Sequence, residues 1–139
     1  MVAEMFVDTS AWFALTDRAT PGHRAVESAL RDRLQKGTVL VTTNLVIAET
    51  HVLLLRRTTQ RVALAFVREV GRPPNAIVTS IHDLEHAAVR DWLERYADQP
   101  FSFTDAVSFS VMRARRISEA LTLDHHFAVA GFAVVPARA

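Results

Sequence analysis

The sequence predicts an α/β protein with three layers (α/β/α) and a central, mainly parallel sheet of four to five short strands. Two observations support this prediction. Short apolar runs of three or four residues recur along the chain, and segments with helical periodicity separate them. Such alternation is typical of a parallel sheet that helices cover on both faces. We expect the whole chain, residues 1–139, to form a single domain.

The first third of the chain supplies two strands and two helices. Met5–Val7 is a short apolar run, and Asp8-Thr9-Ser10 follows it with three residue types that begin helices. Thr20-Pro21 is typical of an N-cap followed by proline at the first helical position. The helix that begins there is expected to end at Gly37. Val39–Val41 is the second predicted strand.

The middle of the chain continues the alternation. Thr43-Asn44 is expected to cap a strongly apolar helix that runs through Leu55. A further helix runs from Thr59 to Val70 and ends at the turn-forming residues 71–74. Ala76–Val78 is the third predicted strand.

The last third supplies two helices and two strands. Periodicity predicts a helix over Asp83–Tyr96, and Pro100 separates it from a second helix that runs from Ser102 to about Arg115. Ala120–Leu123 and Phe132–Val135 are the fourth and fifth predicted strands.

Composition limits the function classes. The net charge is only +1, so bulk charge does not indicate a polyanionic partner, although all the basic residues except Lys36 are arginine, which suits bidentate phosphate contacts. Cysteine is absent, which excludes disulfides and thiolate metal sites. No apolar run is long enough to span a bilayer, and no signal peptide is visible. We therefore expect a cytoplasmic protein without membrane contact.

Four of the 15 acidic residues adjoin apolar segments instead of lying on polar helix faces. They are Asp8, Glu49, Asp105 and Asp124. Ligands of open parallel sheets bind at the carboxyl ends of the strands, and Asp8 and Asp124 each follow a predicted strand. Hard divalent ions such as Mg²⁺ and Mn²⁺ prefer oxygen ligands. Together the four carboxylates suggest a shared cation.

Glu49 is the most informative of these acids. Its neighbours at helical spacing are Leu45, Val46, Val52 and Leu53, which places it on the stripe predicted to face the core. An unpaired carboxylate there would be strongly destabilising, so it needs a partner, a metal ion or a raised pKa. A structural salt bridge to an arginine is the alternative.

The other three acids also have structural alternatives. Asp8 would cap the helix that follows it, and Asp124 would cap a short helix over His125–Val129. Ser102–Asp105 fits the capping-box pattern, with aspartate in place of the usual glutamate or glutamine.

Histidine offers little support for a different metal. His125 and His126 cannot both face one site in a regular helix or strand. His82 and His86 have helical spacing but no evident further ligand, so they are interpreted as part of a polar helix face.

These residues resemble the signature of PIN-domain ribonucleases, and specifically of the VapC-type toxins of type II toxin–antitoxin pairs. The matching segments occur in the family's order and spacing over nearly the whole chain: Val7–Ala11, Ala48-Glu49, Phe103–Ala106 and Leu121–Phe127. The resemblance implies a PIN-like fold and a carboxylate pocket that holds one or two Mg²⁺ or Mn²⁺ ions. It also implies hydrolysis of RNA phosphodiester bonds, a cognate VapB-type antitoxin and a homodimer.

The resemblance further implies roles for individual residues. Asp8 and Asp105 would be the central metal ligands, and Glu49 and Asp124 would complete the pocket, directly or through water. Three hydroxyl side chains are candidates to orient these carboxylates or to touch phosphate, with helix capping as the alternative: Thr9, Ser10 and Thr104. Three arginines are candidates to contact the RNA backbone, with a solvated helix face as the alternative: Arg113, Arg115 and Arg116.

Other classes with acidic α/β sites fit less well. A response-regulator receiver domain has paired acids after the first strand and a lysine after the last, whereas Thr9-Ser10 follows Asp8 and the single lysine is Lys36. A haloacid-dehalogenase phosphatase has a second aspartate at the position of Ser10. A PIN nuclease of RNA processing that is not a toxin, and a non-catalytic PIN-like module that binds RNA or metal, stay open. The sequence does not identify the RNA.

Overall fold

The computed structural model describes residues 2–137, which contain five strands in one parallel sheet with the order β3-β2-β1-β4-β5. The strands are β1 (Glu4–Val7), β2 (Val39–Thr43), β3 (Ala76–Val78), β4 (Glu119–Leu121) and β5 (Ala133–Val135). The predicted parallel sheet is therefore confirmed, with β1 at its centre.

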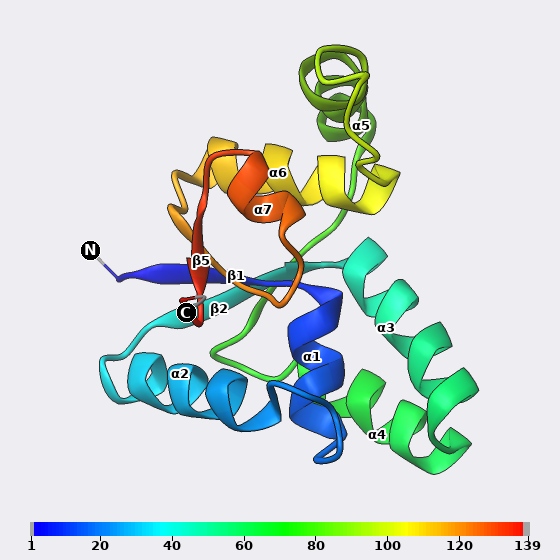
Figure 1. The fold of residues 1–139 in the computed structure, drawn as a ribbon, viewed down its shortest axis with the longest axis vertical. Helices are drawn as coiled ribbons and strands as arrows, with labels where there is room; N and C mark the ends of the chain where they lie inside the picture. The colour runs from blue at the N-terminus through cyan, green and yellow to red at the C-terminus, as the bar shows by residue number, and fades with distance from the viewer. Residues whose placement is uncertain (1, 138–139) are drawn as a thin grey trace.

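Helices cover both faces of this sheet. They are α1 (Thr9–Thr16), α2 (His23–Gln35), α3 (Asn44–Arg57), α4 (Gln60–Val70), α5 (His82–Ala88), the π-helix η1 (Val89–Glu94), α6 (Phe103–Arg115) and α7 (His126–Val129). Figure 1 shows α1, α2 and α4 on one side of the strands and α5, α6 and α7 on the other. The predicted three-layer architecture is confirmed. Between residues 2 and 137, no helix combines the length and apolarity needed to cross a membrane.

The core forms around β1 and α6. Met5, Phe6 and Val7 are fully buried, as expected for the central strand of a sheet covered on both faces. Residues 105–112 of α6 are all buried, so this helix is enclosed by the sheet and its neighbouring helices. The ring of Phe109 on α6 packs edge-on against Phe127 at 4.9 Å between centroids. This contact packs α6 against α7.

The start of α2 differs from the predicted cap at Thr20-Pro21. The helix begins at His23, and its N-cap is Gly22 with a φ of +89°. A β-carbon on Gly22 would lie 3.2 Å from the side chain of Leu123, so both the backbone conformation and the close approach favour glycine here. The Thr20 carbonyl accepts a hydrogen bond from the His23 amide (3.0 Å) and closes a turn before the helix.

The predicted helix over Asp83–Tyr96 forms, but its second half is the π-helix η1. Ala88 and Trp92, four residues apart, are both buried. Residues four apart lie on one face of the helix, so both side chains point into the core. The indole ring of Trp92 then packs against Phe109 at 5.0 Å.

Candidate active site

The pocket is built where β1 and β4 end side by side. Val7 pairs with Leu121, so Asp8 and Thr122 come next to each other. Thr122 Oγ1 donates a hydrogen bond to Asp8 Oδ2 (3.0 Å), and Ser10 Oγ donates to the same oxygen (3.1 Å). Although Asp8 is the N-cap residue of α1, its side chain makes no capping hydrogen bond. The capping alternative for the Asp8 side chain is therefore wrong.

The Ser10 hydroxyl also fixes the bend that follows β4. Ser10 Oγ accepts a hydrogen bond from the Leu123 amide (2.9 Å), and Thr122 Oγ1 accepts one from the Asp124 amide (2.9 Å). Because these side-chain bonds replace continued strand pairing, β4 ends at Leu121 and not at the predicted Leu123. The bend carries Asp124 to the end of β1.

Asp105 serves both the helix and the pocket. Ser102 Oγ accepts a hydrogen bond from the Asp105 amide (2.9 Å), and Asp105 Oδ2 accepts one from the Ser102 amide (3.1 Å). The predicted capping box is thus present at the start of α6. The same Asp105 oxygen lies 3.1 Å from Nδ1 of His126, which belongs to α7. The capping box and the pocket therefore share one carboxylate.

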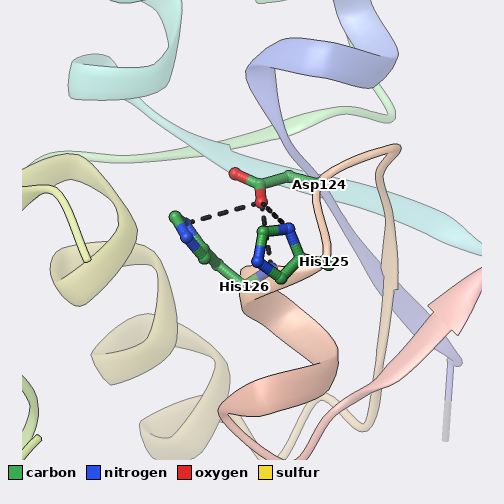
Figure 2. Close-up of side chains that lie close together, drawn as sticks. All are labelled: Asp124, His125 and His126. Atoms are coloured by element: carbon green, nitrogen blue, oxygen red, sulfur yellow. Dashed lines mark hydrogen bonds and ion pairs between the residues drawn. The ribbon is translucent and has the colours of Figure 1, made fainter. Parts of the chain in front are cut away.

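Figure 2 shows the side chains of Asp124, His125 and His126 close together at the start of α7. Asp124 Oδ1 accepts a hydrogen bond from the His126 amide (2.9 Å), but the N-cap of α7 is His125, so the prediction that Asp124 caps a helix beginning at His125 is wrong by one residue. The same oxygen lies 3.5 Å from His126 Nδ1 and 3.8 Å from His125 Nδ1. The expectation that these histidines cannot both face one site assumed a regular helix or strand, whereas His125 is the N-cap that precedes α7 and His126 is the first helical residue, and both ring nitrogens approach Asp124.

The face that α3 turns to the core differs from the prediction. Val46, Thr50 and Leu54 are buried, whereas Glu49 is exposed and Val52 is 44% exposed. Thr50 lies in the core because its hydroxyl donates to the Val46 carbonyl (2.7 Å). The placement of Glu49 on the core-facing stripe is therefore wrong. Apolar residues occur on every side of this helix, so the pattern did not define one face.

Burial and charge together perturb Asp8. Burial raises the pKa of its carboxyl to about 6, and the negative charges of Asp105 and Asp124 act in the same direction. Hydrogen bonds from the Thr9 backbone and the Thr122 hydroxyl oppose the rise in this pKa but do not cancel it. Asp8 is thus buried close to two other carboxylates.

Glu49 reaches the same pocket from α3. Partial removal of its carboxyl from water raises its pKa, the Thr104 side chain opposes this, and the charges of Asp105 and Asp124 raise the pKa further. The structure therefore brings together all four acids that the sequence singled out, although Glu49 comes from an exposed helix face.

These carboxylates lack an arginine or lysine partner in the part of the chain that the structure describes. Within residues 2–137, no arginine or lysine forms an ion pair with any of the four acids. The ionisable side chains that contact them are histidines: His126 contacts Asp105 and Asp124, and His125 contacts Asp124. The salt-bridge alternative for Glu49 is therefore wrong for the described chain. Clustered carboxylate oxygens that lack a cationic partner fit a hard divalent ion. The donor set is thus suited to the metal that the sequence suggested.

The three candidate hydroxyl residues have different surroundings. Ser10 contacts Asp8 directly, and Thr104 lies beside Glu49. Thr9 is buried, and its hydroxyl oxygen has no hydrogen-bond partner among the described residues.

The three candidate RNA-binding arginines do not join the acids. Asp105 is in the first turn of α6, whereas Arg113, Arg115 and Arg116 lie at the other end of this helix, which is about 20 Å long. Arg115 pairs with Glu4 at the start of β1 (2.6 Å), and Arg113 lies over the Trp92 ring (4.7 Å). A contact of these arginines with RNA held at the pocket is not supported.

Sequence reasoning missed Thr122 and His126 as members of the site. A signal for Thr122 was present, because a polar residue interrupts the apolar strand two positions before Asp124. His126 had no such signal, since its approach to Asp105 depends on how α7 packs against α6.

The parallel sheet and its acid-lined carboxyl edge define an α/β protein with a carboxylate site suited to a divalent metal. The chain belongs to the PIN-domain family, whose domain matches residues 5–133. PIN-domain nucleases generally depend on divalent metals, in agreement with the acidic pocket.

Two comparisons with relatives specify the similarity further. The chain is 38% identical over 134 residues to the 23S rRNA-specific endonuclease VapC20 of Mycobacterium tuberculosis, covering 94% of this chain and 97% of that protein. The crystal structure of M. tuberculosis VapC20, described as a sarcin-ricin loop cleaving toxin, matches with a TM-score of 0.84 and 35% identity over 92% of this chain and 95% of that one. The predicted family resemblance and enzyme class, a PIN-domain nuclease, are confirmed.

A third comparison concerns the fold alone. VapBC2 of Rickettsia felis, bound to a DNA fragment from its promoter, matches with a TM-score of 0.69 and 12% identity over 94% of this chain and 96% of that one. The shared fold therefore persists where little sequence similarity remains.

Proposed function

We propose that this chain is a Mg²⁺- or Mn²⁺-dependent endoribonuclease and the toxin of a VapBC-type toxin–antitoxin pair. The observation that carries the proposal is the cluster of Asp8, Glu49, Asp105 and Asp124 at one sheet edge, where no arginine or lysine of residues 2–137 pairs with them. The similarity to VapC20 supports 23S rRNA as the substrate, with the sarcin–ricin loop as the cleaved element. A PIN nuclease of RNA processing is the alternative, because the pocket alone does not select the RNA.

Asp8 and Asp105 would hold the metal directly, and Glu49 and Asp124 would complete its coordination directly or through water, for one or two ions. When bound, the ion offsets the carboxylate charges, attracts the phosphate oxygens and lowers the pKa of bound water. Ser10 and the other groups bonded to Asp8 and Asp105 orient these carboxylates through one oxygen each, Oδ2. This arrangement supports a preorganised metal pocket.

The apolar surface of the protein offers a place for a partner to bind. A groove of about 670 Å³ between α1, α2 and α4 is lined mainly by apolar side chains, including Leu15, Leu30, Leu34, Val62 and Phe66. We propose that the apolar tail of a VapB-type antitoxin binds there. We also propose a cytoplasmic homodimer in which residues 1–139 of each copy form a single domain.

Asparagine substitutions at Asp8 and Asp105 test the proposed activity. The asparagine oxygen can still accept the hydrogen bonds at each position, so both variants are expected to fold. Cleavage of 23S rRNA in Mg²⁺ should fall more than about 100-fold, because even groups behind metal ligands typically contribute 10- to 100-fold. EDTA should abolish wild-type cleavage. Asp98→Asn, at an exposed position, is the matched control. Undiminished cleavage by either pocket variant would contradict the proposal.

A further inference from the structure

A second pocket adjoins the acids on the side of α3. It has a volume of about 400 Å³ and is lined by Thr9, Glu49, Val52, Leu53 and Arg56. Four of these residues come from α3, and Thr9 comes from the first turn of α1. Glu49 belongs to both this pocket and the acidic cluster, so the two adjoin at this residue. A ligand held at the carboxylates therefore has room to extend along α3.

Arg56 is the only cationic residue that lines this pocket. It is exposed and forms no hydrogen bond or ion pair with any residue between 2 and 137. The adjacent Arg57 instead lies over the Phe13 ring at 5.7 Å. Arg56 follows Glu49 by seven residues, which places it on the same helix face about 10 Å further along. The pocket thus ends in an unpaired guanidinium.

The surface between the two charged ends is apolar. Val52 is 44% exposed and Leu53 is half-buried, and both lie between Glu49 and Arg56 on α3. The order is therefore carboxylates that would hold the metal, an apolar wall and a guanidinium. RNA presents a matching order: the phosphate that is cleaved, a sugar and base, and the next phosphate. Guanidinium binds phosphate through two parallel hydrogen bonds, and apolar side chains cover a sugar or base face.

We propose that this pocket binds the nucleotide next to the cleaved phosphodiester, with Arg56 contacting its phosphate and Val52 and Leu53 contacting its sugar or base. The proposal rests on the ribonuclease function proposed above and identifies part of its RNA-binding surface. Arg56 holds the substrate and takes no part in bond cleavage.

Direct binding tests the phosphate contact. The probe is a fluorescein-labelled RNA hairpin with the sarcin–ricin loop sequence, titrated by anisotropy over a range of salt concentrations. Asp8→Asn serves as the non-cleaving background, with and without Arg56→Gln. Losing one phosphate contact should weaken binding several-fold and reduce the slope of log K against log salt by about 0.7 to 1. The matched control is Arg68→Gln, an exposed arginine on α4 with the same change in net charge.

Cleavage kinetics separate binding from catalysis. Arg56→Gln in the otherwise unchanged protein should raise KM for the hairpin several-fold and change kcat less than about twofold, because the contact is present equally in the ground and transition states. Arg56→Lys should restore the salt slope but only part of the affinity, since lysine lacks the bidentate geometry.

The outcomes distinguish the two proposals. If the wild-type protein cleaves the hairpin in Mg²⁺ but Arg56→Gln behaves like Arg68→Gln in salt slope and KM, the nucleotide pocket is wrong and the ribonuclease function stands. If the wild-type protein does not cleave the hairpin or 23S rRNA in Mg²⁺ or Mn²⁺, both proposals are overturned.

Discussion

Asp8 supplies a carboxylate to the candidate site, and its burial there lowers the stability of the fold. The residue is 5% exposed, and two hydroxyl groups donate hydrogen bonds to one of its carboxyl oxygens. These bonds do not offset burial beside Asp105 and Asp124, and the pKa of Asp8 rises to about 6. The folded protein therefore binds a proton at Asp8 more tightly than the unfolded chain does.

This difference predicts how stability depends on pH in the absence of metal. Because the pKa of Asp8 is about 6 in the folded state against 3.8 for an ordinary aspartate, the unfolding free energy should fall as the pH rises from about 4 to 6. The upper bound of the loss is about 3 kcal/mol. The measurement is denaturant unfolding in EDTA across this range.

Variants and metal separate Asp8 from other causes of that pH dependence. Asp8→Asn should remove most of the loss and be more stable than the wild type at pH 7, whereas the exposed Asp98→Asn should follow the wild type. Adding Mg²⁺ at pH 7.5 should stabilise the wild type, because the ion binds the folded state. Identical curves for the wild type and Asp8→Asn would show that burial of Asp8 does not cause the pH dependence of stability.

The start of helix α6 serves both the fold and the candidate site. Its capping box satisfies the first amides of the helix and at the same time fixes the Asp105 carboxylate at the pocket. The buried run that follows, residues 105–112, then anchors this cap to the core. Stability of the helix start and order of the metal ligand are therefore coupled.

Ser102→Ala is expected to weaken both. Losing the hydroxyl that accepts from the Asp105 amide should lower the unfolding free energy by about 1 kcal/mol. The less restrained carboxylate should also require a higher Mg²⁺ concentration for half-maximal RNA cleavage. Ser28→Ala, at an exposed position within α2, is the control and should cause no loss, since alanine favours helix. Unchanged stability and metal requirement in Ser102→Ala would contradict this coupling.

Across the whole molecule, the two edges of the sheet differ in charge. At the amino edge, Glu4 pairs with Arg115 and Glu119 pairs with Arg33. At the carboxyl edge, the four pocket acids have no arginine or lysine partner among the described residues. The protein neutralises its acids where the fold needs stability and leaves them available where a cation is expected to bind.

Residues with local signals were predictable, and residues placed by tertiary packing were not. Asp8 and Asp124 follow strands, and Asp105 follows a serine at capping-box spacing, so short sequence patterns identified them. The face of Glu49 depends on which side of α3, a helix with apolar residues all around it, meets the sheet. The contact of His126 with Asp105 depends on the packing of α7 against α6. Neither arrangement can be predicted from the hydrophobic periodicity of the sequence.

The proposed homodimer is testable through helix α4. Leu64 and Val67 are 46% and 43% exposed and lie three residues apart on one face of this helix. Covering such side chains in a second copy would remove apolar surface from water. Light scattering should therefore give twice the chain mass of 15.5 kDa.

Glutamates at both Leu64 and Val67 should shift the protein to the chain mass while circular dichroism stays unchanged, because exposed positions tolerate charge. Ile81→Glu, which places the same charge at a side chain that is 55% exposed and lies before α5, should leave the dimer intact. A wild-type protein that has the chain mass at every micromolar concentration would contradict the homodimer. A double variant that remains dimeric would move the interface away from α4, because two buried carboxylates without partners would not be accommodated there.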